Sequence, residues 1–313
     1  MDEHKEQQRL HFDHVTLPER LPLRETVMAL HQVTYNRFVR ALPLRDGDRV
    51  LELGFGWVQL VRVLAGNARF QGVGMDLSAT MVAAAHRERG RMHFMVGDAE
   101  SIPFGSGSFE RLIALSLLEH LPHQQQALTE MNRVLKPGGH LLLQLPVRDD
   151  VLTWQFFFRS RHPESWVAIM KNLAHKPELV PHSRSLRQWL DRAGFDIEWE
   201  RRDEVLFQPM YDYLVLPLLD RLKVWKDGKK TQAESTPARR FATPLPVEEG
   251  NPPATEPEKP WRPKPSGIHR YLLPVASLLL IPDYLLGRCG IGACVWILAR
   301  KRESVTGPIG STG

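Results

Sequence analysis

Short apolar runs alternate with longer mixed stretches along the first two thirds of the chain. The runs are five to eight residues long and rich in Leu, Val, Ile, Met and Phe. Nearly continuous apolar runs of this length are typical of strands that are covered on both faces. We therefore predict five parallel strands, at residues 49–53, 70–75, 92–96, 110–117 and 140–145.

Apolar residues recur with helical spacing between these runs. Ser78 suits an N-cap, Pro122 suits a first helical turn, and Gly194 suits a helix end. The predicted helices cover residues 57–65, 79–89, 122–135 and 183–194. Strands alternating with helices at these intervals predict an α/β fold with a Rossmann-like, doubly wound, mostly parallel sheet. A sixth strand is predicted at 195–202 and a last one at 293–302.

The remaining segments differ from this core at 44–205. Residues 1–43 are predicted to form an N-terminal helical cap, with a polar lead-in and a helix at 23–42 that Pro43 ends. Residues 206–290 form a predicted insertion before the last core strand at 291–302, and 303–313 form a tail. Within the insertion, residues 227–267 carry nine prolines among polar and charged residues, a composition that predicts a flexible linker.

The segment 271–287 is strongly apolar but is interrupted by Pro274, Pro282 and Asp283. It is shorter than the roughly 20 apolar residues that a membrane-spanning helix needs. Two interpretations remain: it packs over a substrate pocket, or it lies in a membrane interface. Because the polar N-terminal sequence resembles no signal peptide, we expect a cytoplasmic protein, either free or on the inner membrane face.

The charge of the chain changes this picture little. The formal net charge is +5 and the pI is about 9.3, which would suit nucleic acid or an anionic membrane. The excess is concentrated in residues 221–240, within and just before the predicted linker. A solvated basic segment is the simpler interpretation, so we do not expect a nucleic-acid partner. Cys289 and Cys294 lack metal-site spacing and are expected to be reduced packing residues, and we predict no metal.

A glycine turn follows the first predicted strand. Gly54 and Gly56 allow a tight turn and close approach of a ligand. The residue three positions after Gly56 is Gln59, where a dinucleotide-binding motif has glycine next to the pyrophosphate. The turn therefore favours a cofactor without a pyrophosphate.

Two carboxylates follow the next two strands. Asp76 ends the second strand, 22 residues after Gly54, where a carboxylate can accept both hydroxyls of a ribose. Asp98, with Ala99, follows the third strand, where a carboxylate can accept an adenine amino group. Taken alone, each has an ordinary structural alternative, a helix cap for Asp76 and a turn residue for Asp98.

Four segments carry a family resemblance: VLELGFG at 50–56, GVGMDLS at 72–78, VGDAESIPFGSGSFERLIALSLLEHL at 96–121 and LTEMNRVLKPGGHLLLQLP at 128–146. Together they resemble the class I S-adenosylmethionine (SAM)-dependent methyltransferases, in particular the small-molecule group that includes the ubiquinone and menaquinone methyltransferases. The resemblance implies seven strands, with the sixth and the antiparallel last strand paired at one edge. It also implies SAM as the cofactor.

The same resemblance implies roles for individual residues. The first motif implies a cradle for the methionine end of SAM, and the later strand ends imply the ribose, adenine and methionine contacts. The implied cofactor residues are Glu52, Gly54, Gly56, Met75, Asp76, Leu77, Asp98, Ala99, Ser116 and Leu117. Glu119 and His120 match an E-H pair on the substrate side. Val58 departs from the family, which usually has a third glycine there.

The catalytic base and the acceptor are less constrained. His120 is our candidate base because it follows the fourth strand and has a pKa suited to neutral pH; its alternative is a packing role. His182 and Arg184 are weaker candidates. The apolar segment 271–287 and the aromatic run 154–158 predict a small, lipophilic methyl acceptor. The alternatives are an RNA or protein methyltransferase, or a non-catalytic scaffold, which Val58 motivates.

Overall fold

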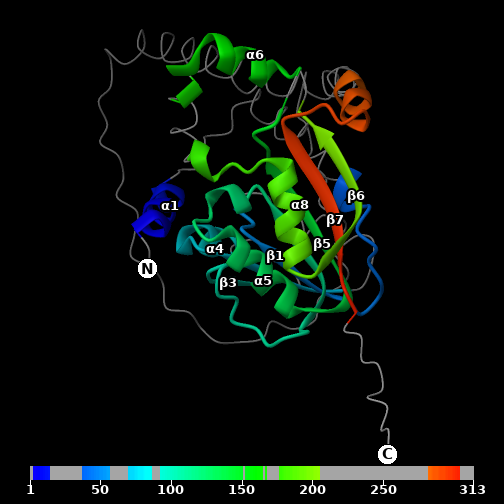
Figure 1. Ribbon diagram of the computed structural model, residues 1–313. Helices are drawn as coiled ribbons and strands as arrows, with labels where there is room; N and C mark the ends of the chain where they lie inside the picture. The colour runs from blue at the N-terminus through cyan, green and yellow to red at the C-terminus, as the bar shows by residue number, and fades with distance from the viewer. Residues whose placement is uncertain are drawn as a thin grey trace, which may run out of the picture.

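Seven strands form one sheet in the order β3-β2-β1-β4-β5-β7-β6 (Figure 1). The computed structural model describes residues 3–14, 37–56, 70–86, 92–150, 152–164, 166–167, 176–204 and 281–303. The strands are β1 (Arg49–Leu53), β2 (Gln71–Asp76), β3 (Met92–Val96), β4 (Phe109–Leu115), β5 (Leu135–Pro146), β6 (Phe195–Asp203) and β7 (Cys294–Lys301).

The pairing of the strands confirms the predicted fold class. The ladders β3–β2, β2–β1, β1–β4 and β4–β5 are parallel. β7 is antiparallel to both β5 and β6 and lies between them. The last strand in the sequence is therefore not an edge strand, and β6 forms the edge.

The helices lie before the first strand or between strands along the chain. They are α1 (Glu3–His14), α4 (Ala79–His86), α5 (Gln124–Val134), α6 (Trp154–Arg161) and α8 (Ser183–Arg192), with short 3-10 helices η1 (Leu118–His120) and η2 (Pro177–Leu179). Residues 281–288 are also helical. The Ser78 hydroxyl accepts the Met81 N–H at 3.2 Å, which confirms the predicted cap of α4.

Two elements differ from the sequence-based prediction. Residues 3–14, predicted as a polar lead-in, form helix α1. Its polar sequence is helical because Arg9 pairs with Glu6 and Asp13, three and four residues away on the same face. β5 begins at Leu135, five residues earlier than predicted, because Leu135 pairs with Phe109 of β4.

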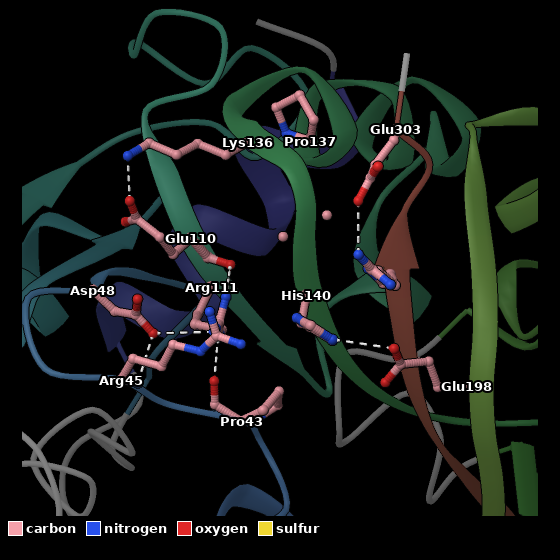
Figure 2. A pocket seen from close by; sticks show the side chains of 13 residues that line it. Pro43, Arg45, Asp48, Glu110, Arg111, Lys136, Pro137, His140, Glu198 and Glu303 are labelled. Atoms are coloured by element: carbon pink, nitrogen blue, oxygen red, sulfur yellow. Dashed lines mark hydrogen bonds and ion pairs between the residues drawn. The ribbon is translucent and has the colours of Figure 1, made fainter. Parts of the chain in front are cut away.

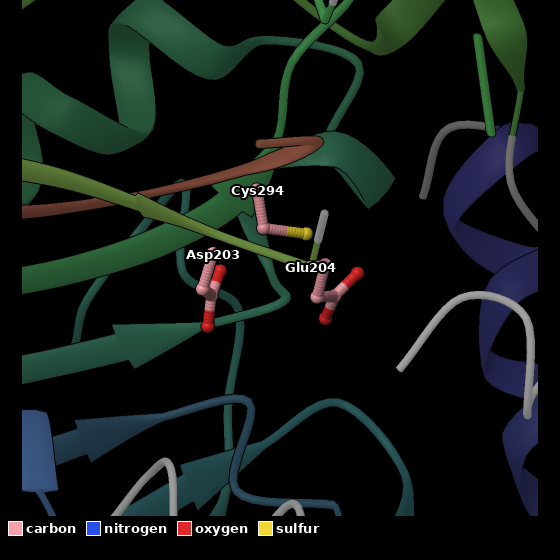
Figure 3. Close-up of side chains that lie close together, drawn as sticks. All are labelled: Asp203, Glu204 and Cys294. Carbon is pink, nitrogen blue, oxygen red and sulfur yellow. The ribbon is translucent and has the colours of Figure 1, made fainter. Parts of the chain in front are cut away.

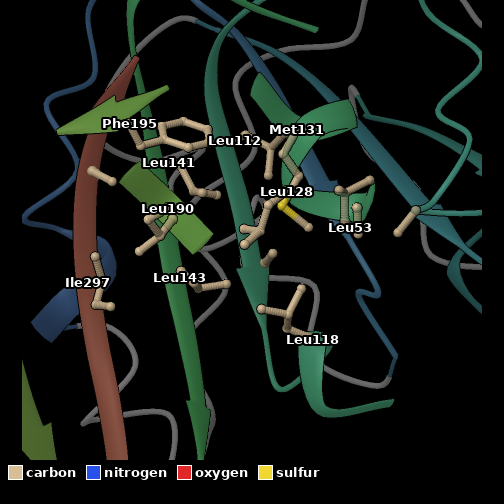
Figure 4. Close-up of a cluster of buried hydrophobic side chains, with 14 of the residues drawn as sticks. Leu53, Leu112, Leu118, Leu128, Met131, Leu141, Leu143, Leu190, Phe195 and Ile297 are labelled. Atoms are coloured by element: carbon tan, nitrogen blue, oxygen red, sulfur yellow. The ribbon is translucent and has the colours of Figure 1, made fainter. Parts of the chain in front are cut away.

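The core explains why the central strands are apolar along their whole length. Side chains alternate between the two faces of a strand. Leu112 of β4 and Leu141 of β5 face α5 and α8, whose Leu128 and Leu190 complete a buried cluster (Figure 4). The intervening Ile113 faces the other side of the sheet. Both faces are therefore covered, and the sheet needs no polar face.

On that second face, the described covering elements are α4, which forms a buried cluster around Phe94 of β3, and the short helical segment at residues 37–39. Phe38 stacks on Trp296 of β7 with ring centroids 4.4 Å apart. Val39 and Ile113 belong to the same buried cluster. The end of the predicted N-terminal cap thus packs directly on the centre of the sheet.

Several predicted segments lie outside the described residues. These are the helix at 57–65 with Val58, most of the helix at 23–42, most of the insertion at 206–290 with its linker, and the tail after 303. Within the described part, no helix is both long and apolar enough to cross a bilayer.

Candidate functional site

The turn after β1 is shaped by two glycines in the left-handed region. Gly54 has φ +63° and Gly56 has φ +44°. A Cβ on Gly54 would lie 2.8 Å from Leu117 Cδ1, whereas a Cβ on Gly56 would meet none of the described residues within 4 Å. Among these residues, the turn is therefore closed on the side of Leu117 and open at Gly56. Glu52, one strand position earlier, is buried in β1.

Asp76 ends β2 directly beside this turn. Its Oδ2 accepts the Gly56 N–H and its Oδ1 accepts the Ser78 N–H, both at 2.9 Å. Burial raises the pKa of this carboxyl group, against the opposing effect of these two hydrogen bonds. Met75 is buried and Leu77 is half-buried on either side of Asp76. The carboxylate is thus held rigidly next to the open side of the glycine turn.

Asp98 lies two residues after the end of the neighbouring strand, β3. Its Oδ1 accepts the Glu100 N–H at 2.9 Å, and its Oδ2 accepts a hydrogen bond from Lys5 of α1 at 2.6 Å. Ala99 is buried behind it. Asp98 therefore presents a charged but partly covered carboxylate at the end of β3.

Ser116 and Leu117 follow β4. Ser116 has φ +47°, which is uncommon for a residue other than glycine. Its hydroxyl donates to Gln144 Oε1 at 2.8 Å, and its N–H donates to the Gln144 backbone oxygen at 2.9 Å. This strained turn places Leu117 against Gly54. Such backbone conformations concentrate at ligand sites.

Strand register brings these four turns together. Leu53 pairs with Met75 and with Ala114, and Asp76 pairs with Val96. The carboxyl ends of β1, β2, β3 and β4 therefore lie side by side. We call this side of the sheet, where the parallel strands end, its carboxyl edge. The predicted cofactor residues form a contiguous row along this edge, as expected for a ligand site in an open α/β sheet.

The side chains of Glu119 and His120, the E-H pair, lie in different surroundings. Glu119 in η1 is fully buried, and burial, helped by the nearby charge of Glu204, raises its pKa to about 8. The His120 ring is half-buried and meets Phe12 of α1 edge-on, with centroids 5.6 Å apart. Glu119 therefore faces the end of β6, while His120 faces α1.

His182 and Arg184 have exposed side chains at the start of α8. Between them, Ser183 donates its hydroxyl and its N–H to Asp149, which also pairs with Arg202 at 2.8 Å. The Asp149 network anchors the start of α8 to β6. The structure gives His182 and Arg184 no contact with the strand-end residues.

The sequence did not reveal the polar cluster at the ends of β6 and β7. Figure 3 shows Asp203, Glu204 and Cys294, whose ligand atoms lie within 4.8 Å of one another. Trp296 Nε1 donates to Asp203 Oδ2 at 2.7 Å. Burial raises the pKa of the Cys294 thiol, so it stays protonated at neutral pH. The predicted pairing of strands 195–202 and 293–302 was the signal that could have located this cluster.

Helix α1 also contributes side chains that the sequence did not reveal. Lys5 contacts Asp98, and the Ser78 hydroxyl donates to Asp13 at 2.5 Å. Its charged side chains gave no indication of a position over the strand ends, because the helix contacts residues 65 or more positions away.

A separate cavity of about 530 Å³ lies at the opposite edge, near the amino ends of β1 and β4 (Figure 2). Most of its polar lining residues are paired: Lys136 with Glu110, Arg111 with Asp48, His140 with Glu198 and Arg300 with Glu303. This cavity shares no residue with the strand-end row.

The residues of the strand-end row fit SAM. Gly54 and Gly56 both have positive φ angles, and a Cβ on Gly56 would contact no residue of the described part of the chain. Asp76 and Asp98 offer two carboxylates at neighbouring strand ends, and carboxylates accept hydrogen bonds from ribose hydroxyls and amino groups. Val58, which departs from the family pattern, lies outside the described residues.

Comparison with known proteins agrees with this arrangement. A family model described as a methyltransferase domain matches residues 51–143. The demethylmenaquinone methyltransferase of Mycobacterium marinum is 30% identical over 205 residues, covering 60% of this chain and 85% of that protein. A Penicillium expansum protein named O-methyltransferase cnsE is 28% identical over 176 residues, covering 53% of this chain. The match spans 60% of the Penicillium protein's length.

A solved structure shares the fold. Phosphoethanolamine N-methyltransferase 2 of Haemonchus contortus, in complex with S-adenosyl-L-methionine, aligns with a TM-score of 0.50 and 18% identity, covering 87% of this chain and 53% of that one. Three findings support the same family assignment: the strand order, the row of turn and carboxylate residues, and the similarity to the Mycobacterium protein. The chain belongs to the class I SAM-dependent methyltransferase family.

Proposed function

We propose that this protein transfers the methyl group of SAM to a small, lipophilic acceptor. One observation carries the proposal: the glycine turn, Asp76 and Asp98 lie at adjoining strand ends in a chain of the methyltransferase family. The SAM sulfonium supplies an already activated methyl group for in-line displacement by the acceptor.

The task of the chain is then to hold the two reactants in line. Asp76 would accept the ribose hydroxyls and Asp98 the adenine amino group. The turn at Gly54 and Gly56, with Ser116 and Leu117, would hold the methionine portion. Each of these groups is fixed by hydrogen bonds or packing.

His120 is the proposed base when the acceptor atom carries a proton. It follows β4 at the carboxyl edge of the sheet, and its half-buried ring is held edge-on by Phe12. Glu119 is protonated at neutral pH because burial raises its pKa to about 8, so it is the poorer proton acceptor of the pair.

The acceptor is proposed to be apolar. The Mycobacterium relative is named for a quinone substrate. Around the end of the molecule that carries α6, Leu152 and Phe157 expose large apolar side chains, and so do Ile281 and Leu285 of the helical segment 281–288. Side chains of this kind suit contact with a lipophilic substrate or with the membrane that dissolves it. We propose that the protein works at the inner membrane face.

Calorimetric titration with S-adenosylhomocysteine tests the cofactor site. The parent protein is expected to bind saturably, and Asp76→Ala to weaken binding by about 10-fold or more, because hydrogen bonds to a charged group are lost. Glu110→Ala is the matched control, since it removes a carboxylate from the opposite edge of the sheet. It is expected to leave the affinity unchanged.

A second assay tests the transfer itself. Protein incubated with methyl-labelled SAM and a detergent-dispersed demethylated quinol is expected to move the label into the organic phase. Cofactor binding without transfer to any apolar acceptor would overturn the proposed substrate class. An absence of cofactor binding in the parent protein would overturn the enzymatic proposal and leave the scaffold interpretation.

A further inference from the structure

Helix α1 lies beside α4 (Figure 1) and contacts the turns that follow three strands at the carboxyl edge of the sheet. Near β2, Asp13 accepts hydrogen bonds from the Ser78 hydroxyl at 2.5 Å and from the Thr80 N–H at 3.4 Å. Past β3, Lys5 pairs with Asp98, and past β4, His4 Nε2 lies 2.9 Å from the His120 backbone oxygen. One helix therefore bridges every turn assigned above to the adenosine part of the cofactor.

Lys5 makes the strongest of these contacts. Its ammonium group lies 2.6 Å from Asp98 Oδ2 and 2.5 Å from Glu100 Oε2. Its side chain is 13% exposed, and the Glu100 side chain is 1% exposed. Although burial opposes it, the two carboxylates raise the pKa of Lys5. A permanently charged ammonium group therefore fills the space beside Asp98.

Both oxygens of Asp98 are engaged in this arrangement. Oδ1 accepts the Glu100 N–H and Oδ2 accepts the Lys5 ammonium. A neutral amino group, such as that of adenine, makes a weaker hydrogen bond to a carboxylate than an ammonium group does. It would have to share or displace Lys5.

We propose that Lys5 sets the cofactor affinity of this protein by competing with the adenine amino group for Asp98. The inference rests on the proposed function, because it takes Asp98 as the adenine contact. Helix α1 is then a closing element with two states: docked through Lys5 when the cofactor site is empty, and shifted when Asp98 turns to the cofactor. The cost of the shift lowers the apparent affinity.

Removal of Lys5 isolates this effect. Glu100 keeps a second partner, because its Oε1 accepts the His123 N–H at 2.8 Å. Helix α1 keeps its own pairs of Arg9 with Glu6 and Asp13, and its contact with Ser78. Lys5→Met, whose side chain is nearly as long, therefore frees Asp98 but also removes the ionic partner of Glu100 Oε2, and the Asp98→Asn background separates these two effects.

The experiment is calorimetric titration with S-adenosylhomocysteine, in a thermodynamic cycle of parent, Lys5→Met, Asp98→Asn and the double variant. Lys5→Met is expected to bind about 3- to 10-fold more tightly than the parent. In the Asp98→Asn background the same change is expected to have no effect. Lys136→Met is the charge-matched control: it breaks an ion pair with Glu110 at the opposite edge and should leave the affinity unchanged.

Salt gives an independent readout. Because Lys5 and Glu100 are largely buried, salt screens these ion pairs only weakly, and the affinity of the parent protein is expected to rise only slightly with ionic strength. Unchanged or weaker binding by Lys5→Met, or equal tightening in the Asp98→Asn background, would overturn the proposal.

The outcomes separate this inference from the proposed function. Binding that Asp98→Asn weakens but Lys5→Met leaves unchanged would reject the role of Lys5 alone. Failure of every variant, the parent included, to bind would reject the proposed function and this inference with it.

Discussion

The carboxyl group of Glu119, in η1 just after β4, is completely buried. Its pKa of about 8 lies well above the ordinary value of 4.5, because burial penalises the charged form. Between these two pH values the folded chain holds a proton that the unfolded chain has released. Its contribution to stability is therefore complete below pH 4.5, and it is lost as the pH rises to about 8.

Glu119→Gln removes this dependence. The free energy of unfolding, measured by urea titration at pH 5, 6.5 and 8, is expected to fall more steeply with pH in the parent than in the variant. The difference approaches about 1.4 kcal/mol per pH unit within the window. Glu178→Gln, at an exposed position in η2, should give a curve parallel to the parent. Parallel curves for Glu119→Gln would contradict burial of a protonated carboxyl group.

Among single residues, the sequence predicts the site residues that lie at the ends of strands. It does not predict the residues that helix α1 brings to the site from a distant part of the chain. Asp76 and Asp98 could be predicted because each follows an apolar run, and parallel strands end at one edge. The Lys5 contact could not be predicted, because 93 positions separate it from Asp98. Helical periodicity says which residues share a face of α1, but it does not say what that face meets.

Within the described part of the chain, the large apolar side chains of greatest exposure lie in α6, just before it, and in the helical segment 281–288. Leu152 is 59% exposed, Phe157 52% and Leu285 55%. Arg161 and Arg288 are exposed on the same two helices. Figure 1 places both helices towards the end of the molecule where β7 begins. Apolar and basic side chains together suit the surface of an anionic membrane.

Flotation with vesicles tests this surface. The parent protein is expected to float with vesicles that contain phosphatidylglycerol, and less with phosphatidylcholine alone. The double variant Phe157→Ser, Leu285→Ser is expected to lose most of this association. Val96→Ser is the control, because Val96 is 49% exposed but lies on β3, at the far edge of the sheet. Equal flotation of the double variant and the parent would rule out this surface.

Strands were predictable from their apolar runs. The runs predict β1 and β3 to the residue, although β3 is an edge strand in which His93 and Val96 are exposed. Helix α1 could not be recognised in the same way. Its sequence is polar on nearly every face, and ion pairs along the helix and contacts with distant turns hold it in place.

For the molecule as a whole, β7 joins two parts of the sheet. It pairs along its length with β5 on one side and with β6 on the other. Val295, Trp296 and Ile297 are almost completely buried. Without β7, two strands would expose unpaired backbone groups and the core would lose three large side chains.

Truncation tests this dependence. A chain that ends after Gly290 is expected to show no cooperative thermal transition by circular dichroism, because it lacks β7. A chain that ends after Glu303 retains every described strand and is expected to unfold within a few degrees of the full chain. A cooperative transition in the shorter chain would mean that the first five strands, with β6, are stable by themselves.

The position of β7 has a consequence for synthesis on the ribosome. The ribosome completes β6 before it makes residues 204–293, which separate β6 from β7 by 90 residues. At ordinary elongation rates these residues take roughly 5 to 20 s. During that interval the neighbour of β5 is missing, and β6 can bind to the wrong partner. We expect this exposed edge to make the newly made chain a client of chaperones until its final strand emerges.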